Sequence, residues 1–220
     1  SYAIKSLIKE FNKKNPDINV RVTLGGSGKL VAQILHGAPY DLFMSANMKY
    51  PQALYKKSLA ITEPIVYAQG SLAYLSSQKH NFSDIYSLLN SNAIKKIAIA
   101  SPKTAPYGAA SVEAFKKAGL YEELKKKLVY GESISQTLSY TLSAVDMGLI
   151  AKSALYSPKL AYLKEGVNWS SVDTKLYTPI KQGVVILKRA QNNRAVENFY
   201  TFVLSDTGRK ILKDFGYIVP

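Results

Sequence analysis

The segment Leu24–Leu30, with the sequence LGGSGKL, lies where an alternating apolar run gives way to helical periodicity. A glycine-rich turn that ends in Gly-Lys before a helix is typical of a phosphate-binding loop. The Walker loop needs a glycine five positions before Gly28, where this chain has Thr23, and a hydroxyl residue where it has Leu30. A dinucleotide-binding fingerprint also fails, because Val31 stands in place of the third glycine. The turn therefore does not predict nucleotide binding.

A more general chemistry remains possible at this turn. The first N–H groups of a helix are unpaired and carry partial positive charge, so a helix that begins here suits an oxyanion. Ser27 adds a hydroxyl donor from the expected N-cap position. An ordinary helix cap in a tight turn explains the same residues, and the local sequence does not decide between the two.

Two other segments place small or hydroxyl residues before a predicted helix. One follows a strand expected at 97–100 and enters its helix through Tyr107. The other follows a short strand at 129–130 and enters its helix near Ile134. In open α/β sheets, ligands bind at such junctions beyond the carboxyl ends of the strands. Three such junctions support an anion-binding site more strongly than a single junction would, although every α/β protein contains a few of them.

Catalytic and metal-binding chemistry has little support in the residue inventory. The chain has no cysteine, which excludes disulfides, thiolate metal sites and a cysteine nucleophile. Its two histidines, His36 and His80, lack the spacing of metal ligands, and no G-x-S-x-G elbow exposes a serine nucleophile. The 16 tyrosines are expected at half-buried strand and helix positions. We therefore expect neither enzyme activity nor a cofactor.

The formal net charge of +14 is compatible with nucleic acid, an acidic membrane surface or a small anion as partner. The lysines occur mostly as pairs and one triplet beside helical patterns, and no basic segment has interleaved aromatic residues. Solvated helix faces are the preferred explanation, so we expect no nucleic-acid partner. No apolar run approaches the roughly 18 residues needed to cross a bilayer.

Apolar periodicity switches repeatedly between the helical and the extended pattern along the 220 residues. This alternation predicts an α/β fold with mostly parallel sheets. The helices are expected at 4–11, 30–35, 51–60, 82–89, 108–118 and 134–143, with two more in the tail on either side of the break at 205–208. The strands are expected at 17–25, 40–46, 71–75, 97–100, 129–130, 147–151 and 182–188.

With these elements in place, the chain resembles the periplasmic molybdate-binding proteins of ABC importers over nearly its full length. The likeness rests on the segments GGSGKLVAQILHGAPYDLFMSAN, ASPKTAPYGAASVEAFKKAGLYEELKKKLVYGES and TGRKILKDFGYIVP. It implies an α/β, two-lobed periplasmic-binding-protein fold with two crossover hinge strands. Lobe I would comprise 1–68 and 182–220, and lobe II 69–181. The resemblance further implies a periplasmic monomer that delivers molybdate or tungstate to an ABC transporter permease at the membrane.

The resemblance also implies an oxyanion site made of neutral donors, in which the metal is held only as its oxyanion. Ser27 corresponds to a serine that donates its hydroxyl and amide, while Tyr107 and Ile134 correspond to amide donors at helix starts. Lys29 is expected to be peripheral. Family members carry another ligand one or two residues before the position of Ser1. We therefore expect that first strand and its ligand to be absent, with Ser1 as the nearest substitute.

Neutral donors suit an anion that is fully ionised near neutral pH, such as molybdate or tungstate, whereas phosphate keeps a proton that needs an acceptor. Glu132 is the only carboxylate in the three turns, and we expect it to cap a helix or contact the hinge. Some family members use a tyrosine hydroxyl where this chain has Ala151 and Lys152, so either Tyr107 compensates or the donor set is smaller. A sulfate- or tungstate-selective receptor and the oxyanion-sensing domain of a transcriptional regulator remain as alternatives.

Overall fold

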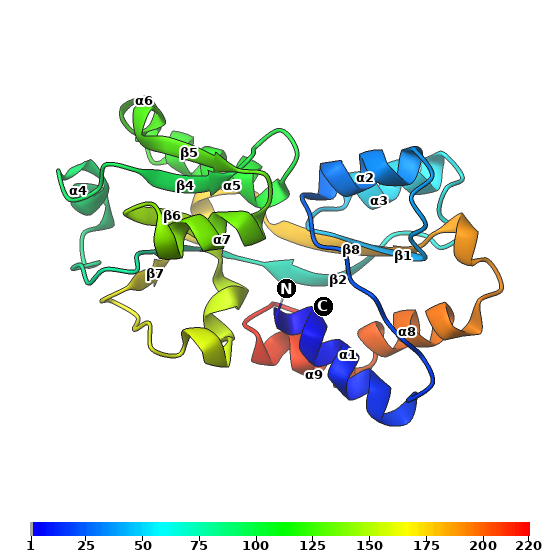
Figure 1. Cartoon of the computed structure of the whole chain (residues 1–220). Coiled ribbons are helices and arrows are strands. Elements are labelled where there is room, and N and C mark those ends of the chain that lie inside the picture. Colours follow the sequence, from blue (N-terminus) through cyan, green and yellow to red (C-terminus); the bar gives the residue numbers. More distant parts are fainter. Residues whose placement is uncertain (1) are drawn as a thin grey trace. The chain divides into compact units, whose positions relative to one another are not determined.

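A computed structural model describes residues 2–220 and divides them into two compact units. Unit 1 comprises the described residues up to Gly70 together with Lys181–Pro220, and unit 2 comprises Ser71–Ile180. The chain therefore passes from one unit to the other twice. Figure 1 shows the elements in chain order, and each unit has its own sheet.

Unit 1 is built on a three-stranded sheet with the order β1-β8-β2. Strand β1 runs antiparallel to β8, with Phe43 opposite Val185. An isolated antiparallel β-bridge between Gln69 of β2 and Ile218 attaches the end of the chain to this sheet. The strands of unit 1 are β1 (Leu42–Ser45), β2 (Ile65–Gly70) and β8 (Ile180–Ile186), and its α-helices are α1 (Tyr2–Lys14), α2 (Ser27–Leu35), α3 (Lys49–Lys56), α8 (Arg194–Leu204) and α9 (Asp206–Asp214).

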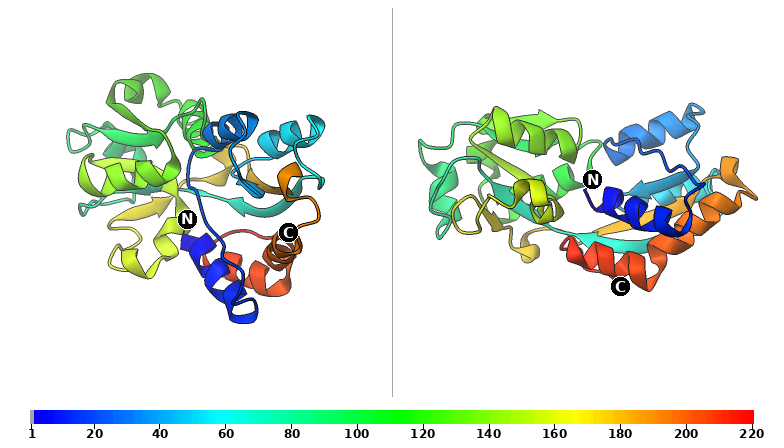
Figure 2. Two further views of the ribbon diagram at one scale, coloured as in Figure 1. Left: turned by 45° about the vertical axis from the view of Figure 1, so that its right-hand side comes forward. Right: turned by 60° about the horizontal axis from the view of Figure 1, so that its bottom comes forward.

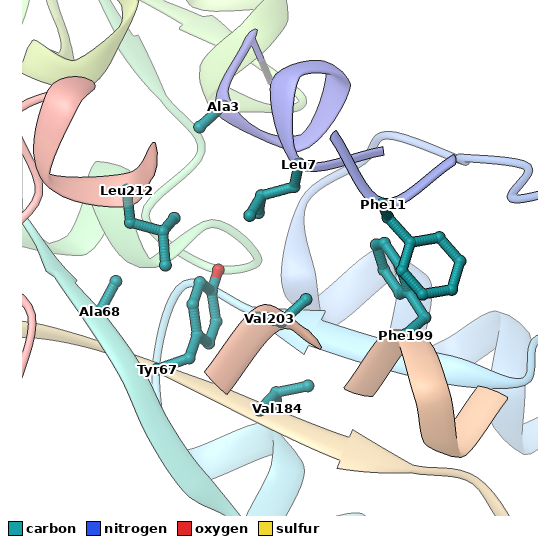
Figure 3. Packing of buried hydrophobic residues seen from close by; sticks show 9 residues of the cluster. All are labelled: Ala3, Leu7, Phe11, Tyr67, Ala68, Val184, Phe199, Val203 and Leu212. Atoms are coloured by element: carbon teal, nitrogen blue, oxygen red, sulfur yellow. The ribbon is translucent and has the colours of Figure 1, made fainter. Parts of the chain in front are cut away.

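One hydrophobic core of unit 1 lies between its sheet and α1, α8 and α9. Ala3, Leu7 and Phe11 recur every four residues along α1, so they share one face of the helix, and all three are buried. Figure 3 shows Leu7 close to Leu212, and the Phe11 ring beside that of Phe199. Figure 2 shows α1 beside the two C-terminal helices in both views. Apolar periodicity thus brings the first and last helices of the chain together.

Unit 2 has a five-stranded mixed sheet with the order β5-β4-β6-β3-β7. Strand β4 is parallel to β5 and β6, whereas β3 is antiparallel to β6 and β7. Figure 1 shows α7 in front of this sheet and α5 behind it. The strands are β3 (Leu72–Leu75), β4 (Ile97–Ala100), β5 (Leu128–Gly131), β6 (Met147–Ala151) and β7 (Trp169–Ser171), and the α-helices are α4 (Ile85–Asn90), α5 (Pro106–Lys117), α6 (Tyr121–Leu124) and α7 (Ile134–Ser143).

The predicted α/β class is confirmed, but two expectations about strands are wrong. The sheets are not mostly parallel, because β1 pairs antiparallel with β8 in unit 1, and in unit 2 β3 pairs antiparallel with both β6 and β7. The strand expected at 17–25 forms no ladder with any described residue. Ile18 and Val20 nevertheless pack against the core formed by α1, α8 and α9, whereas Val22 and Leu24 are 47% and 52% exposed. Alternation there reflects packing of an extended segment, not pairing within a sheet.

Candidate functional site

The turn that precedes α2 leaves the start of this helix uncapped by any side chain. Gly26, not Ser27, is the N-cap residue, and its carbonyl accepts the Leu30 N–H at 3.0 Å. Since glycine has no side chain, no cap covers the first amides of the helix. Within residues 2–220, no hydrogen bond uses the N–H of Ser27 or Gly28. These amides and the helix dipole favour an anion at this position.

The Ser27 side chain lies at the first helical position and is only 6% exposed. Its Oγ accepts the N–H of Ala46, the residue that follows β1, at 3.1 Å. A serine hydroxyl has one proton to donate in addition to its acceptor capacity. In the described part of the chain, no acceptor takes that proton. Ser27 therefore presents a fixed oxygen whose proton is available to a ligand. The Lys29 side chain in the same turn is exposed.

The residues that hold Ala46 form a hydrogen-bonded turn between β1 and α3. Ser45 Oγ accepts the Asn47 N–H at 3.2 Å and donates to Asn47 Oδ1 at 3.4 Å. Asn47 Oδ1 also accepts the N–H of Tyr50 in the first turn of α3 at 3.2 Å. This turn was not predicted from the sequence, although an asparagine three residues before a helical amide is a helix-start signal.

In unit 2, α5 begins with Pro106, so the first N–H of this helix belongs to Tyr107. Tyr107 is 3% exposed, and its carbonyl accepts the Ser111 hydroxyl at 2.8 Å. The next residue, Gly108, lies so close to the end of β4 that an added Cβ would overlap the carbonyl oxygen of Ala100. Only glycine permits this close approach, which brings the Tyr107 amide near the carboxyl end of β4.

The start of α7 has a reciprocal side-chain cap. Ser133 is the N-cap, and its Oγ accepts the Gln136 N–H at 3.2 Å. Gln136 Oε1 in turn accepts the Glu132 N–H at 2.6 Å. Ser133 and Gln136 thus cap this helix start, and the role expected for the Glu132 carboxylate stays a prediction. Among the described residues, the N–H groups of Ile134 and Ser135 make no hydrogen bond, so they point out of the helix start unused.

The two junctions of unit 2 lie at the same edge of its sheet. Strands β4 and β5 are parallel neighbours with Ala100 opposite Gly131, and the Ser101 N–H donates to the Gly131 carbonyl at 2.7 Å. The starts of α5 and α7 therefore both follow the carboxyl ends of adjacent parallel strands. Tyr107 and Ile134 belong to this edge of unit 2, while Ser27 belongs to unit 1. Ser1, the fourth candidate, lies outside the described residues.

Strand β6 ends at the same edge, where a tyrosine hydroxyl was considered from the family pattern. The residues there are Ala151 and Lys152. The Lys152 Nζ donates to Ser171 Oγ at 2.8 Å and lies 5.6 Å from the ring centroid of Trp169. This lysine is therefore held against β7 by a hydrogen bond and a cation–π contact.

A carboxylate ties α5 to the segment that leads out of unit 2. Glu113 accepts the N–H and the hydroxyl of Thr178 at 2.9 and 3.0 Å, and it pairs with Lys117 at 2.9 Å. Desolvation raises the pKa of Glu113, but the hydrogen bonds from Thr178 and Lys117 together bring it below its ordinary value. The ionised form therefore stabilises the folded state.

Neither a bare-metal site nor a membrane span is found over residues 2–220. No three His, Asp or Glu side chains in this range gather closely enough to hold a metal ion. No helix in the same range is long and apolar enough to cross a bilayer. What the three junctions offer chemically is a set of neutral hydrogen-bond donors.

Comparison with known proteins gives matches along nearly the whole chain. The family model of bacterial extracellular solute-binding proteins matches residues 1–218. The molybdate-binding protein ModA of Azotobacter vinelandii is 33% identical over 216 residues, which cover 97% of this chain and 84% of that protein. ModA of Rhodobacter capsulatus is 33% identical over 201 residues, or 90% and 77% of the two chains. The solved periplasmic molybdate-binding protein of Azotobacter vinelandii superposes with a TM-score of 0.91 at 29% identity, covering 99% and 94%.

Proposed function

The chain belongs to the family of bacterial extracellular solute-binding proteins, and on that premise we propose that it captures molybdate and delivers it to an ABC importer. The periplasmic-binding-protein fold is confirmed by the TM-score of 0.91. We propose molybdate as the substrate because the relatives are named as molybdate-binding proteins. We propose a location outside the cytoplasmic membrane because the family is one of extracellular proteins. The proposed partner is the importer's permease.

The observation that carries the proposal is the state of Ser27. Its buried hydroxyl is held by the Ala46 N–H at 3.1 Å, its proton has no acceptor among residues 2–220, and it lies at an uncapped helix start. In these surroundings the Ser27 hydroxyl can donate a hydrogen bond to an acceptor atom of a ligand. The proposed donor set adds the amides of Tyr107 and Ile134 at the helix starts of unit 2.

The donor chemistry favours a fully deprotonated oxyanion. Molybdate is a dianion near neutral pH and presents only acceptors, so hydroxyl and amide donors satisfy it. A monoprotonated phosphate would need an acceptor for its proton, and a buried polar group without a partner costs about 1–3 kcal/mol.

The test is a calorimetric titration of the purified protein with molybdate, followed by competition with tungstate, sulfate and phosphate. We expect tight molybdate binding, strong competition by tungstate, and little by sulfate or phosphate. Sulfate competing equally would replace the proposal with the sulfate-receptor alternative. Absence of molybdate binding would refute it. Elemental analysis of the protein after purification from molybdate-supplemented cells should find molybdenum bound to the wild type.

A further inference from the structure

We propose that Asn47 is a positioning residue of the oxyanion site, which acts through the Ala46 amide to orient the hydroxyl of Ser27. The inference rests on the proposed function and deepens it, because it identifies a residue that orients one of the donors without touching the ligand itself. Three features of the structure support it: the hydrogen bonds of the turn, the attachment of the turn to α3, and the packing of the turn on β8.

The first support is the reciprocal hydrogen bonding of Ser45 and Asn47. The Asn47 N–H donates to Ser45 Oγ at 3.2 Å, and the Ser45 hydroxyl donates back to Asn47 Oδ1 at 3.4 Å. The two bonds enclose Ala46, the only residue between the partners. Ser45 itself is 1% exposed, so its side chain has no water to replace this partner.

The second support is the hydrogen bond that ties the Asn47 side chain to the first turn of α3, whose N-cap residue is Met48. Asn47 Oδ1 accepts the Tyr50 N–H at 3.2 Å, although the helix is bounded at Lys49. A side-chain acceptor for a first-turn amide fixes where the helix begins relative to the preceding strand. One amide side chain therefore joins the end of β1 to the start of α3 and leaves Ala46 little freedom.

The third support is the contact of this turn with the neighbouring strand. Ser45 lies opposite Gly183 in the ladder of β1 and β8. A Cβ added at Gly183 would come within 2.7 Å of Met48 Sδ and 3.0 Å of Pro51 Cγ. Met48 and Pro51 thus lie close above Gly183 of β8, which limits movement of the turn toward this strand.

These constraints converge on Ser27. Because the Ala46 N–H points to Ser27 Oγ at 3.1 Å, it occupies one lone pair of that oxygen and directs the hydroxyl proton elsewhere. A donor prepared in this way loses less rotational freedom when the anion binds. Loss of the Asn47 side chain frees Ala46, and Ser27 then has to select its productive orientation at the moment of binding.

A double-mutant cycle of Ser27→Ala and Asn47→Ala, with molybdate affinity as the readout, tests this coupling. We expect Ser27→Ala to weaken binding about 5- to 150-fold. Asn47→Ala alone should weaken it about tenfold, as loss of an outer-shell partner commonly does. In the Ser27→Ala background the same change should cost less than about twofold. Equal losses in both backgrounds, or no loss from Asn47→Ala alone, would overturn the inference.

The matched control is Asn193→Ala. Asn193 is likewise an asparagine at a helix start of unit 1. It is exposed, and its Oδ1 caps α8 by accepting the Ala195 N–H at 3.1 Å. Removing this cap should lower stability by a similar amount to Asn47→Ala, while molybdate affinity stays unchanged. A loss of affinity in Asn193→Ala would show that cap removal acts through global stability, and the positioning role of Asn47 would fail.

Hydrogen exchange of the Ala46 amide in the ligand-free protein separates this inference from the proposed function. We expect this amide to exchange about tenfold faster in Asn47→Ala and in Ser27→Ala than in the wild type or in Asn193→Ala. If molybdate does not bind at all but this pattern holds, the proposed function fails and the mechanical coupling stands. If exchange of Ala46 is the same in Asn47→Ala and wild type, the coupling is absent.

Discussion

Replacement of Ser27 by alanine should weaken molybdate binding without unfolding the protein. The substitution removes one hydroxyl donor from a side chain that is 6% exposed. It also deprives the Ala46 N–H of its acceptor at 3.1 Å, but that loss is present with and without ligand and largely cancels in the binding free energy. What remains is one hydrogen bond to a charged group, about 1–3 kcal/mol. This corresponds to an increase in Kd of about 5- to 150-fold.

Isothermal titration of wild type and Ser27→Ala under identical salt and pH measures this difference. Ser205→Ala is the matched control, because Ser205 is a helix-start serine of the same unit whose Oγ accepts the Gly208 N–H at 3.2 Å. It should lose about 1 kcal/mol of stability and keep its affinity. A Ser27→Ala protein that binds molybdate as tightly as the wild type would remove Ser27 from the site. The inference that the Ser27 hydroxyl donates its proton to the ligand would then be refuted.

Three further substitutions test the framework that supports the site. Gly108→Ala should destabilise the protein by about 2 kcal/mol or more in urea unfolding, because the new methyl group overlaps the Ala100 carbonyl oxygen. Phe11→Ala should cost about 3–5 kcal/mol in the same assay, since this ring is 2% exposed and packs edge-on against a neighbouring ring in the core. Glu113→Gln should lower the melting temperature at neutral pH. Because the folded-state pKa of Glu113 is depressed, its contribution is present above the unfolded pKa and lost as pH falls through the folded one. The difference in melting temperature between wild type and Glu113→Gln should therefore vanish in acid, and a constant difference would contradict the assignment.

Local sequence signals identified several elements with accurate bounds. The helix expected at 134–143 is α7, and the strands expected at 97–100 and 147–151 are β4 and β6. In each case the deciding information lies within the segment: a hydroxyl N-cap before a helical stripe, or a short apolar run fully buried inside a sheet. Such segments need no knowledge of their partners to be recognised.

Where partners decide the structure, the sequence was a poorer guide. The segment 17–25 alternates like a strand, yet a strand exists only where another backbone accepts its hydrogen bonds. The alternation of Ile18 and Val20 arises from packing on the core of α1, α8 and α9, which involves residues nearly 200 positions away. The antiparallel pairing of β8 depends on the same kind of distant contact.

The residues of the candidate site show the same difference between local signals and distant contacts. Ser27, Tyr107 and Ile134 could be singled out because each lies at a strand-to-helix junction with small residues. The turn of Ser45 and Asn47 was missed, since the role proposed for it depends on a hydrogen bond between residues 19 positions apart. Sequence reasoning finds donors from their local pattern, whereas the residues that orient those donors become visible only through tertiary contacts.

The contrast between a strongly basic chain and a proposed site of neutral donors has a physical explanation. A net charge of +14 attracts a dianion over distances up to the screening length, about 8 Å at physiological ionic strength. Contact with a lysine at the site would add affinity for any small anion, whatever its protonation state or geometry. Hydroxyl and amide donors fixed at helix starts instead require an acceptor at each position, so the fit of the anion decides the binding free energy. In the proposed site, the donors of the first turn are therefore the uncapped helix start and Ser27, and the exposed Lys29 is not among them.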